Sequence, residues 1–381
     1  MNSVLMLISN FYPAVGGAEK QALEISVSLK LRGINVTALT RRINGAVSEE
    51  NLKGIFVKRL PVIGSGIVDS VFFMLEAFFY LLFHARDYGI IHVHLASSPA
   101  VAALIAGKIL GKKVIIKLGG GRGVDEITLS MKTLSGRMKL AFFRIMKPDM
   151  LIMNDETFEW LKNTGEFSGL RLTRFRNGVD TGRYSPVSYS EKISAKHKLR
   201  LENKTVFLFV GRLSPEKRIV EFVEAWGEIL AEELVKPGIH LALVGKGPEE
   251  KKIKDAVEKL NLRESVSMFG QQIELLPYYQ AADVFILPSV SEGLSNSMLE
   301  AMSCGLAIMA SRTGGAKEAV EEGVNGFLFD PFNRQDEKRI IKLFAGDRNL
   351  AVKMGEKSRE IAVKEYSMSK VTDELIKIYQ K

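Results

Sequence analysis

The chain has 381 residues, of which 46% are hydrophobic and 25% charged, a composition typical of a globular protein with two domains. Its single cysteine, Cys304, excludes an intramolecular disulfide and a cysteine-based metal cluster. The net charge of +9 lies in residues 1–185, which hold 24 Lys and Arg against 15 Asp and Glu, whereas residues 186–381 hold 29 of each. This asymmetry indicates an anionic partner for the first half.

The first half alternates strand and helix patterns. Short apolar runs predict strands at residues 4–10, 34–40, 54–60, 90–94, 113–118 and 149–154. Helical periodicity predicts helices at 18–33, 69–86, 98–110 and 130–147. Alternation of this kind implies a parallel, doubly wound sheet.

A polar, strand-poor stretch at residues 181–204 interrupts this alternation. Strand patterns then resume at 205–211, 239–245, 265–270, 283–288, 306–311 and 326–329. We therefore predict two Rossmann-like domains, at residues 1–185 and 186–365, with ligand binding in the cleft between them. Residues 366–381 have the apolar spacing of an amphipathic helix.

The apolar run at residues 71–83 contains Glu76 and has only 13 residues. That length is too short to span a bilayer, so the run indicates a buried helix or an interfacial one. The first ten residues enter a strand pattern without the pattern of a signal peptide.

The loop and helix that follow residues 282–289 carry Glu292 and Glu300. Ser295 or Asn296 is placed to cap this helix, whose N-terminal N–H groups would face a phosphate. Glu300, one turn into the helix, is placed to accept hydrogen bonds from vicinal hydroxyls such as those of a ribose. The pattern predicts a site for an anionic, polyhydroxylated ligand, although each glutamate alone is also typical of an ordinary surface residue.

Three further loops follow predicted strands of the second half, at the sheet edge where open α/β sheets bind ligands. One carries Arg212 and Lys217, two cations suited to a pyrophosphate. In the next, Gly245 and Gly247 let the backbone approach a ligand. Residues 271–273 offer backbone atoms to a nucleobase edge. Each of these features alone is also typical of an ordinary surface loop.

Together these motifs resemble those of the retaining glycosyltransferases of family 4. The resemblance rests on Gly211-Arg212-Leu213 with Lys217, on residues 244–248, on Glu292 and Glu300, on residues 313–329, on Gly16-Gly17-Ala18-Glu19 and on Asn177-Gly178-Val179-Asp180. It implies the GT-B fold, in which two Rossmann-like domains face a central cleft. It further implies that the first domain binds the acceptor, that the second binds the donor, and that the C-terminal helix packs back on the first domain.

The resemblance implies a UDP- or GDP-sugar as donor and a reaction that needs no metal ion or other cofactor. Arg212 and Lys217 would hold the diphosphate and stabilise the negative charge that grows on it as the glycosidic bond breaks. Glu292 would contact hydroxyls of the transferred hexose, and Glu300 would bind the ribose. The other donor-binding residues implied are Gly16, Gly17, Gly211, Gly245, Gly247, Gly293, Leu294, Ser295 and Asn296.

One position departs from the family pattern. Many members carry a His-Gly pair after the strand equivalent to residues 113–118, whereas this chain has Gly119 there. His94, at the end of the preceding predicted strand, is a possible replacement. The loop also offers Gly120, Arg122, Asp125 and Glu126 to an acceptor or sugar. Two interpretations stay open: an active retaining hexosyltransferase, or a catalytically impaired sugar-nucleotide-binding protein.

The basic first half is expected to bind the acceptor, a hydroxyl of a lipid-linked or cell-surface polysaccharide or glycolipid precursor. The predicted helix at 130–147 sets five basic residues among Leu, Met and Phe: Lys132, Arg137, Lys139, Arg144 and Lys147. This pattern favours an anionic bilayer surface, and a core helix with a solvated basic face shares it. The expected location is the cytoplasm, with peripheral attachment to the inner face of the membrane. No nucleic-acid partner is expected, because no aromatic–basic RNA signature accompanies the charge.

Overall fold

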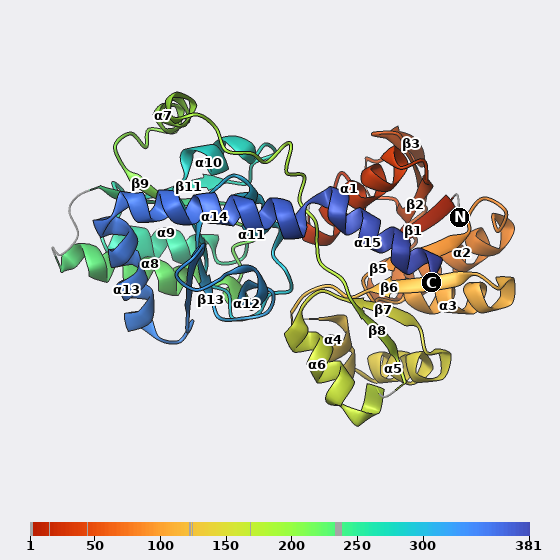
Figure 1. The fold of residues 1–381 in the computed structure, drawn as a ribbon. Coiled ribbons are helices and arrows are strands. Elements are labelled where there is room, and N and C mark those ends of the chain that lie inside the picture. The colour runs from red at the N-terminus through yellow and green to blue at the C-terminus, as the bar shows by residue number, and fades with distance from the viewer. Residues whose placement is uncertain are drawn as a thin grey trace. The chain divides into compact units, whose positions relative to one another are not determined.

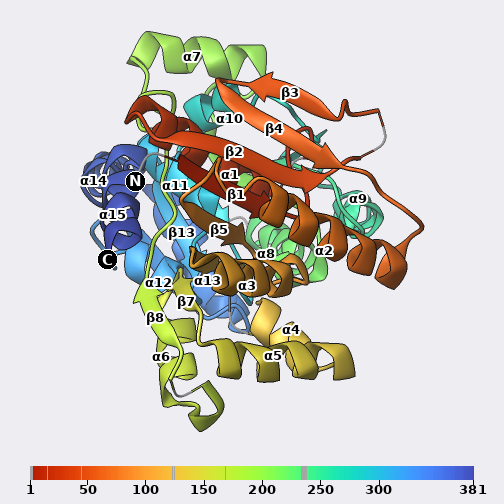
Figure 2. The same ribbon diagram turned by 90° about the vertical axis from the view of Figure 1, so that its right-hand side faces the viewer.

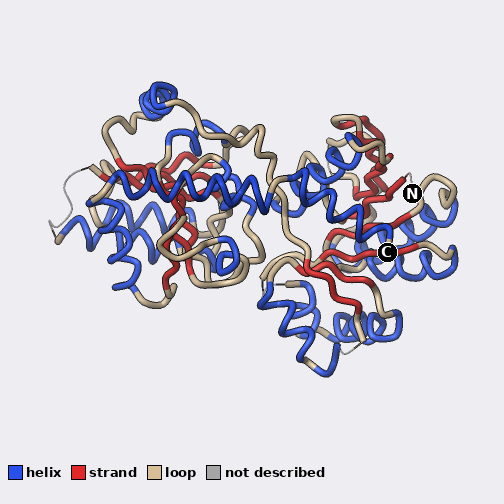
Figure 3. The backbone as a smooth tube through the Cα atoms, viewed as in Figure 1, coloured by secondary structure: helices blue, strands red, loops and turns tan. Residues whose placement is uncertain are grey.

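The structure, a computed structural model, describes residues 3–14, 16–43, 45–121, 123, 125–167, 169–232 and 238–381. Its contacts group into two compact units. Residues 1–178 and 368–381 form unit 1, and residues 179–367 form unit 2. Each unit is a sheet with helices on its faces, as Figures 1 and 3 show. The predicted α/β architecture with two parallel sheets is confirmed.

Unit 1 contains an eight-stranded sheet in the order β3-β4-β2-β1-β5-β6-β7-β8. Its neighbouring strands are parallel, except that β3 pairs antiparallel with β4. The strands are β1 (Ser3–Ile8), β2 (Asn35–Arg41), β3 (Glu49–Leu52), β4 (Ile55–Leu60), β5 (Ile90–His94), β6 (Lys113–Lys117), β7 (Asp149–Ile152) and β8 (Arg171–Arg174). The sequence missed the two edge strands β3 and β8. Neither contains a buried residue, so both lack the apolar run that marks a strand.

Helices cover both faces of this sheet. On one face lie α2 (Gly66–Phe83), α3 (Pro99–Leu110), α4 (Glu126–Met131), α5 (Leu134–Met146) and α6 (Asp155–Asn163), followed by the short helix η1 (Gly165–Phe167). Figure 2 shows α2, α3 and α5 in succession. On the other face lie α1 (Gly17–Leu31) and α15 (Met368–Gln380), whose Thr372 donates to Ser28 at 2.8 Å.

The helix predicted at residues 130–147 is two helices, α4 and α5. Thr133 caps α5, because its hydroxyl accepts a hydrogen bond from the Gly136 N–H at 3.1 Å. Gly136 also allows the two helices to approach each other, since a Cβ there would lie 2.2 Å from the Ser130 carbonyl oxygen. A capping residue and a close-contact glycine thus break the predicted helix, and Lys132 lies in the connection.

Helix α2 starts at Gly66, earlier than the apolar run at 71–83, and so reaches 18 residues. By length and composition alone it is apolar enough to cross a membrane, and 22% of it is buried. Phe73, Ala77 and Leu81 pack into the core of unit 1. The helix therefore lies along the sheet, with one side buried and the other exposed.

Unit 2 contains a six-stranded, fully parallel sheet in the order β11-β10-β9-β12-β13-β14. The strands are β9 (Thr205–Val210), β10 (Ile239–Val244), β11 (Val266–Gly270), β12 (Val284–Leu287), β13 (Ala307–Ser311) and β14 (Gly326–Phe329). β9, β10, β12 and β13 are buried along their whole length, as their continuous apolar runs predict.

One face of this sheet is covered by α8 (Ile219–Ala231), α9 (Glu250–Lys259) and α13 (Arg334–Gly346), and the other by α10 (Leu276–Ala281), α11 (Asn296–Ser303) and α12 (Ala316–Ala319). Helix α14 (Arg348–Tyr366) packs into the hydrophobic clusters on both faces of the sheet. The short helix η2 (Pro215–Lys217) precedes α8. The stretch at 181–204, interpreted as a linker, contains α7 (Tyr189–Lys198). Ser188 and Glu191 form a capping box at its start, a signal that the sequence analysis overlooked.

Candidate functional site

The strand order of unit 2 changes direction between β9 and β12. At such a switch point the loops that follow the two neighbouring strands diverge, and the crevice between them is where open α/β sheets bind ligands. The loop after β9 carries Arg212 and Lys217, and the loop after β12 carries Glu292. The predicted cations and the first glutamate therefore lie at the same edge of one sheet.

Lys217 and Glu292 meet across this switch point. The Lys217 ammonium forms an ion pair with Oε1 of Glu292, and the Ser289 hydroxyl donates to the same oxygen at 3.0 Å. Both charged side chains are mostly buried, with 18% and 13% of their surface exposed. The Val290 N–H also donates to the Glu216 carbonyl oxygen at 2.9 Å. The loops after β9 and β12 are thus held together by charge and by backbone.

Arg212 is exposed at the same edge. Its guanidinium forms no hydrogen bond or ion pair with the residues that the structure describes. Burial raises the pKa of the nearby Glu216, but hydrogen bonds from Ser214 and the backbone, and the charges of Lys217 and Arg212, bring it below its ordinary value. Arg212 therefore presents a positive charge to solvent where the sheet ends.

The loops after β9 and β10 touch through glycines. A Cβ on Gly245 would lie 1.8 Å from the Gly211 carbonyl oxygen, and Gly245 has a φ of +145°. A Cβ on Gly247 would lie 2.1 Å from the Leu213 carbonyl oxygen. That oxygen accepts a hydrogen bond from the Glu249 N–H at 3.0 Å. Gly245 and Gly247 thus allow the backbones of the loops after β9 and β10 to contact each other.

The loops after β12 and β13 interlock in the same manner. Cβ atoms on Gly314 and Gly315 would lie 1.8 Å from the Glu292 carbonyl oxygen and 2.7 Å from that of Gly293. The Gly315 N–H donates to the Gly293 oxygen at 2.7 Å. Sequence reasoning quoted this glycine pair as a motif and missed its task, which is to support the glutamate loop. Two adjacent glycines in the loop after a strand were the available signal.

The α11 N-terminus lies beside this loop. Ser295, and not Asn296, is the capping residue, and its hydroxyl accepts from the Met298 N–H at 3.4 Å. Leu294 is buried in the core of unit 2 and anchors the turn. The positive end of the α11 dipole therefore lies at the end of the loop that follows β12 and carries Glu292.

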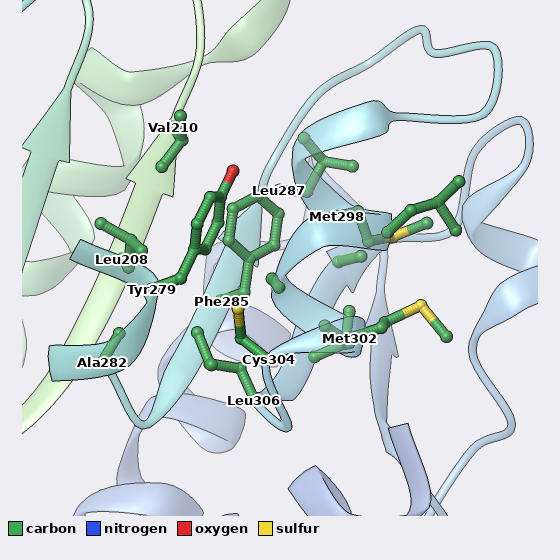
Figure 4. Packing of buried hydrophobic residues seen from close by; sticks show 14 of the residues in the cluster. Leu208, Val210, Tyr279, Ala282, Phe285, Leu287, Met298, Met302, Cys304 and Leu306 are labelled. Carbon is green, nitrogen blue, oxygen red and sulfur yellow. The ribbon is translucent and has the colours of Figure 1, made fainter. Parts of the chain in front are cut away.

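Glu300 lies one turn into α11 and is only 4% exposed. Its Oε2 accepts a hydrogen bond from the Tyr279 hydroxyl at 2.9 Å. Burial, followed by the charge of Glu300, raises the pKa of Tyr279 well above its ordinary value. Figure 4 shows Tyr279 beside Phe285 in the apolar cluster. Sequence reasoning missed Tyr279, because a tyrosine in an apolar helix has the same pattern as any core residue.

In unit 1, Gly16 and Gly17 lie at the start of α1, after β1. Gly16 is the N-cap, with an extended φ of −149°. A Cβ there would lie 2.1 Å from Oε2 of Glu19, which folds back over the helix end. Burial raises the pKa of Glu19 above its ordinary value. Gly16 therefore leaves room for a carboxylate at the α1 N-terminus.

The loop after β6 explains why glycine stands at position 119. The Gly119 N–H donates to Oε2 of Glu126 at 2.9 Å. A Cβ at this position would lie 2.4 Å from Cδ2 of Leu95 and 2.7 Å from Oε1 of Glu126. The space that a histidine side chain would need is thus filled by a neighbouring glutamate. Burial raises the pKa of Glu126 above its ordinary value.

The other residues proposed for this loop are engaged in its own structure or lie outside the description. Asp125 is fully buried and caps α4, because it accepts from the N–H groups of Ile127 and Thr128 at 3.0 and 2.9 Å. Gly120 is exposed with a φ of +67°, a conformation that favours glycine. Arg122 lies outside the described residues.

His94 is buried, with 2% of its surface exposed. Its ring stacks on His92 with the centroids 4.6 Å apart. Burial, together with His92 and Lys117, lowers the pKa of His94 well below its ordinary value. Lys117 donates to the Asn177 side-chain oxygen at 2.7 Å, and burial lowers its pKa to about 7. His94 thus belongs to a buried polar cluster and is shielded from solvent.

Two parallel-sheet α/β units, with cations and a glutamate at the carboxyl edge of the second, define a class of α/β proteins to which many transferases belong. A model described as Glycosyltransferase Family 4 matches residues 15–183, and a model described as Glycosyl transferases group 1 matches residues 190–361. The chain belongs to this family of GT-B glycosyltransferases and is a transferase, which confirms the family and fold inferred from its motifs.

An uncharacterized glycosyltransferase of Haemophilus influenzae is 30% identical over 204 residues, and the match spans 53% of this chain and 56% of that protein. The chain thus covers little more than half the length of this relative. The Escherichia coli UDP-Gal:alpha-D-GlcNAc-diphosphoundecaprenol alpha-1,3-galactosyltransferase is 24% identical over 301 residues, which are 79% of this chain and 77% of that one. The structure of Anabaena Alr3699/HepE with UDP and glucose is 20% identical, covers 100% of both chains and has a TM-score of 0.79.

Proposed function

We propose that the protein is a retaining hexosyltransferase that uses a UDP- or GDP-sugar, with its donor site at the carboxyl edge of the unit 2 sheet. The observation that carries this proposal is the meeting of Lys217 with Glu292 across the switch point, beside the exposed Arg212. Nucleotide sugars carry a diphosphate and several hydroxyls, and this edge offers cations, a carboxylate and a helix N-terminus to both.

Catalysis in this proposal is electrostatic. As the bond between sugar and diphosphate breaks, negative charge grows on the leaving group. Arg212, Lys217 and the N–H groups at the start of α11 are preorganised to stabilise that charge, so the reaction proceeds without a metal ion. When a diphosphate competes for Lys217, Glu292 is released to accept hydrogen bonds from hydroxyls of the sugar.

The remaining donor contacts follow from the placement of the loops. Glu300 binds the ribose, and the hydrogen bond from Tyr279 orients the Glu300 carboxylate. The backbone at Gly211, Gly245, Gly247, Gly293, Leu294, Ser295 and Asn296 lies against the nucleotide. Gly16 and Gly17 of unit 1 are proposed as donor contacts on the resemblance alone. His94, Gly119, Gly120 and Arg122 are proposed as acceptor or sugar contacts from their places in the sequence alone, and a contact by His94 requires that its buried ring become exposed.

The proposed acceptor is a hydroxyl of a lipid-linked or cell-surface polysaccharide or glycolipid precursor. The name of the E. coli relative supports this class, because it describes transfer to a diphosphoundecaprenol-linked sugar. The positive excess of residues 1–185 supports it further. We place the enzyme in the cytoplasm, attached peripherally to an anionic inner membrane surface and acting in cell-envelope synthesis.

The test is a donor screen followed by a transfer assay. Thermal unfolding is measured with UDP- and GDP-sugars, since a ligand that binds only the folded state raises the unfolding temperature. The selected donor is then incubated with lipid-linked acceptors, with and without EDTA, and the anomeric configuration of the product is determined by NMR. We expect an α-linked product from an α-linked donor at an EDTA-independent rate.

Inversion of the anomeric centre, or a rate abolished by EDTA and restored by a divalent ion, would contradict the mechanism. Donor stabilisation without hydrolysis or transfer would favour the second candidate, a catalytically impaired sugar-nucleotide-binding protein. The filling of position 119 by Glu126 favours that candidate specifically. Absence of stabilisation by any sugar nucleotide would contradict both.

A further inference from the structure

Helix α2 displays an unbroken apolar stripe to solvent. The stripe recurs every fourth residue and comprises Ile67, Val71, Leu75, Phe79 and Phe83, all exposed. Val68 on the same helix and Val62 and Ile63 just before it are exposed as well. The two ends of the stripe are the most open, with Ile67 83% and Phe83 82% exposed. Large apolar side chains thus stay exposed over five turns of the helix, in a stripe that winds gradually around its axis, and they are far more than singly scattered residues.

The opposite side of α2 is firmly held. Phe73, Ala77 and Leu81 are fully buried in the core of unit 1. Near the start of the helix, Asp69 is buried and forms an ion pair with Arg41 at 3.0 Å. These contacts set the rotation of α2 about its axis, so the stripe faces outward because of the fold itself.

The neighbouring helices extend this surface. α3 packs against α2 and α5 packs against α3, and Figure 2 shows the three in succession. α3 adds exposed Ile105 and Ile109, and α5 adds exposed Leu134, Met138 and Ile145. Exposed basic residues lie among them, namely Lys108 on α3 and Arg137 and Arg144 on α5. Neither α3 nor α5 contains an Asp or Glu.

We propose that the α2 stripe, with the outer faces of α3 and α5, is the surface by which unit 1 inserts into an anionic phospholipid bilayer. The helix lies parallel to the membrane, its apolar residues enter the boundary between headgroups and acyl chains, and the basic residues contact lipid phosphates. The inference deepens the proposed function, because it names the element that docks the acceptor domain. It adds an apolar contribution to the electrostatic one expected from the basic residues at 130–147, which belong to α5 and to the segments on either side of it.

Charge favours a lipid surface over a second copy of the chain. Two copies that met through this face would bring the basic residues of α3 and α5 toward their own counterparts. Arg144 is paired with Glu166 at 3.0 Å, whereas Lys108 and Arg137 form no ion pair with the residues that the structure describes. The only acidic residues of α2 are Asp69, which is already paired, and the half-buried Glu76. An anionic bilayer instead satisfies the apolar and the basic groups together.

The test uses the full chain and vesicles of phosphatidylcholine alone or with 30% phosphatidylglycerol, at 0.1 and 0.5 M NaCl. The variant is Leu75→Glu with Phe79→Glu, two exposed stripe positions. The matched control is Leu343→Glu with Val352→Glu, two exposed apolar helix positions of unit 2. Vesicle flotation measures the partition coefficient, and circular dichroism and UDP-dependent thermal shift verify that each variant is folded.

We expect wild type to bind anionic vesicles, to keep part of that binding at 0.5 M NaCl, and to bind neutral vesicles weakly. Salt screens the electrostatic part and leaves the apolar part. The stripe variant should lose about tenfold or more in partition coefficient, because two apolar groups are replaced by charges. The control should bind as wild type does, and both variants should keep the thermal response to UDP.

Binding by the stripe variant equal to wild type would overturn the proposal. So would binding that vanishes completely at 0.5 M NaCl, which would assign attachment to charge alone. A dimer by light scattering that the stripe variant dissociates, without vesicle binding, would instead make this face an interface between copies. Vesicle binding through the stripe in a protein that no sugar nucleotide stabilises would support the surface and contradict only the proposed enzyme function.

Discussion

Both parallel sheets end in loops at their carboxyl edges, but the two edges carry different polar and charged groups. In unit 2 the edge presents an exposed Arg212 and a Lys217–Glu292 pair that bridges two loops. In unit 1 the corresponding polar groups are turned inward, as His94 stacks on His92 in the interior and Glu126 bonds to Gly119. The two edges therefore differ in their charged groups: unit 2 has an exposed cation and an ion pair between two loops, whereas the polar groups of unit 1 bond within the unit.

Glycine residues have different structural roles at the two edges. In unit 2, Gly245, Gly247 and Gly314 bring neighbouring loops into backbone contact and so support a surface of charged side chains. In unit 1, Gly119 makes room for an internal carboxylate and removes a side chain from the edge. We therefore expect substitutions of the charged residues of unit 2 to reduce ligand binding and catalysis more than substitutions of the polar residues buried in unit 1.

The largest effect is expected for Lys217→Ala. We expect kcat to fall about 10²- to 10³-fold, as it does when one preorganised donor to a developing negative charge is removed. Transfer or donor hydrolysis under saturating donor measures the effect. Lys252→Ala is the control, since Lys252 is an exposed lysine paired with Glu249 on α9. A Lys217→Ala rate within threefold of wild type would contradict the role of this residue.

The loop contacts of unit 2 are tested by Gly247→Ala. The added Cβ would lie 2.1 Å from the Leu213 oxygen, so the loops after β9 and β10 must separate. We expect a loss of on the order of 1–3 kcal/mol in the free energy of unfolding, measured with urea. Gly346→Ala serves as control, because a Cβ there has no heavy atom within 4 Å. Equal stability of the two variants would show that the contact is unimportant.

The buried polar cluster of unit 1 predicts acid sensitivity. Burial lowers the pKa of His92 to about 3 and lowers that of His94 as well, so both stay neutral in the folded state at pH 5. Unfolded histidines with an ordinary pKa near 6.5 take up protons as pH falls from 7 to 5. The unfolded state then binds more protons, and each histidine lowers stability by about 2 kcal/mol at pH 5.

The variant His94→Leu should therefore lose less stability than wild type between pH 7 and pH 5. His197→Leu is the control, because the His197 side chain is 78% exposed. Urea unfolding at the two pH values measures both. An unchanged difference between pH 7 and pH 5 in His94→Leu would indicate that the buried histidine is protonated in the folded protein.

The smallest effect is expected for Tyr279→Phe, which removes only the hydroxyl that donates to Glu300. We expect a loss of about 1 kcal/mol in the free energy of unfolding, since one intramolecular hydrogen bond is deleted. If Glu300 binds the ribose, donor affinity should fall as well. Tyr278→Phe, at the neighbouring position, should change neither quantity. Tighter donor binding in Tyr279→Phe would contradict the orienting role of Tyr279.

The sequence was sufficient for the parallel sheets, because buried strands such as β9 and β10 are continuous apolar runs. It also placed Arg212, Lys217 and Glu292 at one edge, since loops after parallel strands share an edge. It did not reveal that Glu292 pairs with Lys217 or that Glu126 fills the space beside Gly119. Those contacts depend on loop conformations that no periodicity records. The exposed side of α2 was equally hidden, because the helix is apolar nearly all round and its pattern does not tell which face packs.

Hydrogen–deuterium exchange with and without a saturating nucleoside diphosphate locates the donor site. We expect UDP or GDP to slow exchange in the segments at residues 211–218, 245–249 and 292–300, which follow β9, β10 and β12 and include η2 and the start of α11. Backbone amides near bound diphosphate become less accessible, and their local opening becomes less frequent. Slowed exchange confined to unit 1, or found elsewhere in unit 2 but absent from all three loops, would contradict a donor site at this edge.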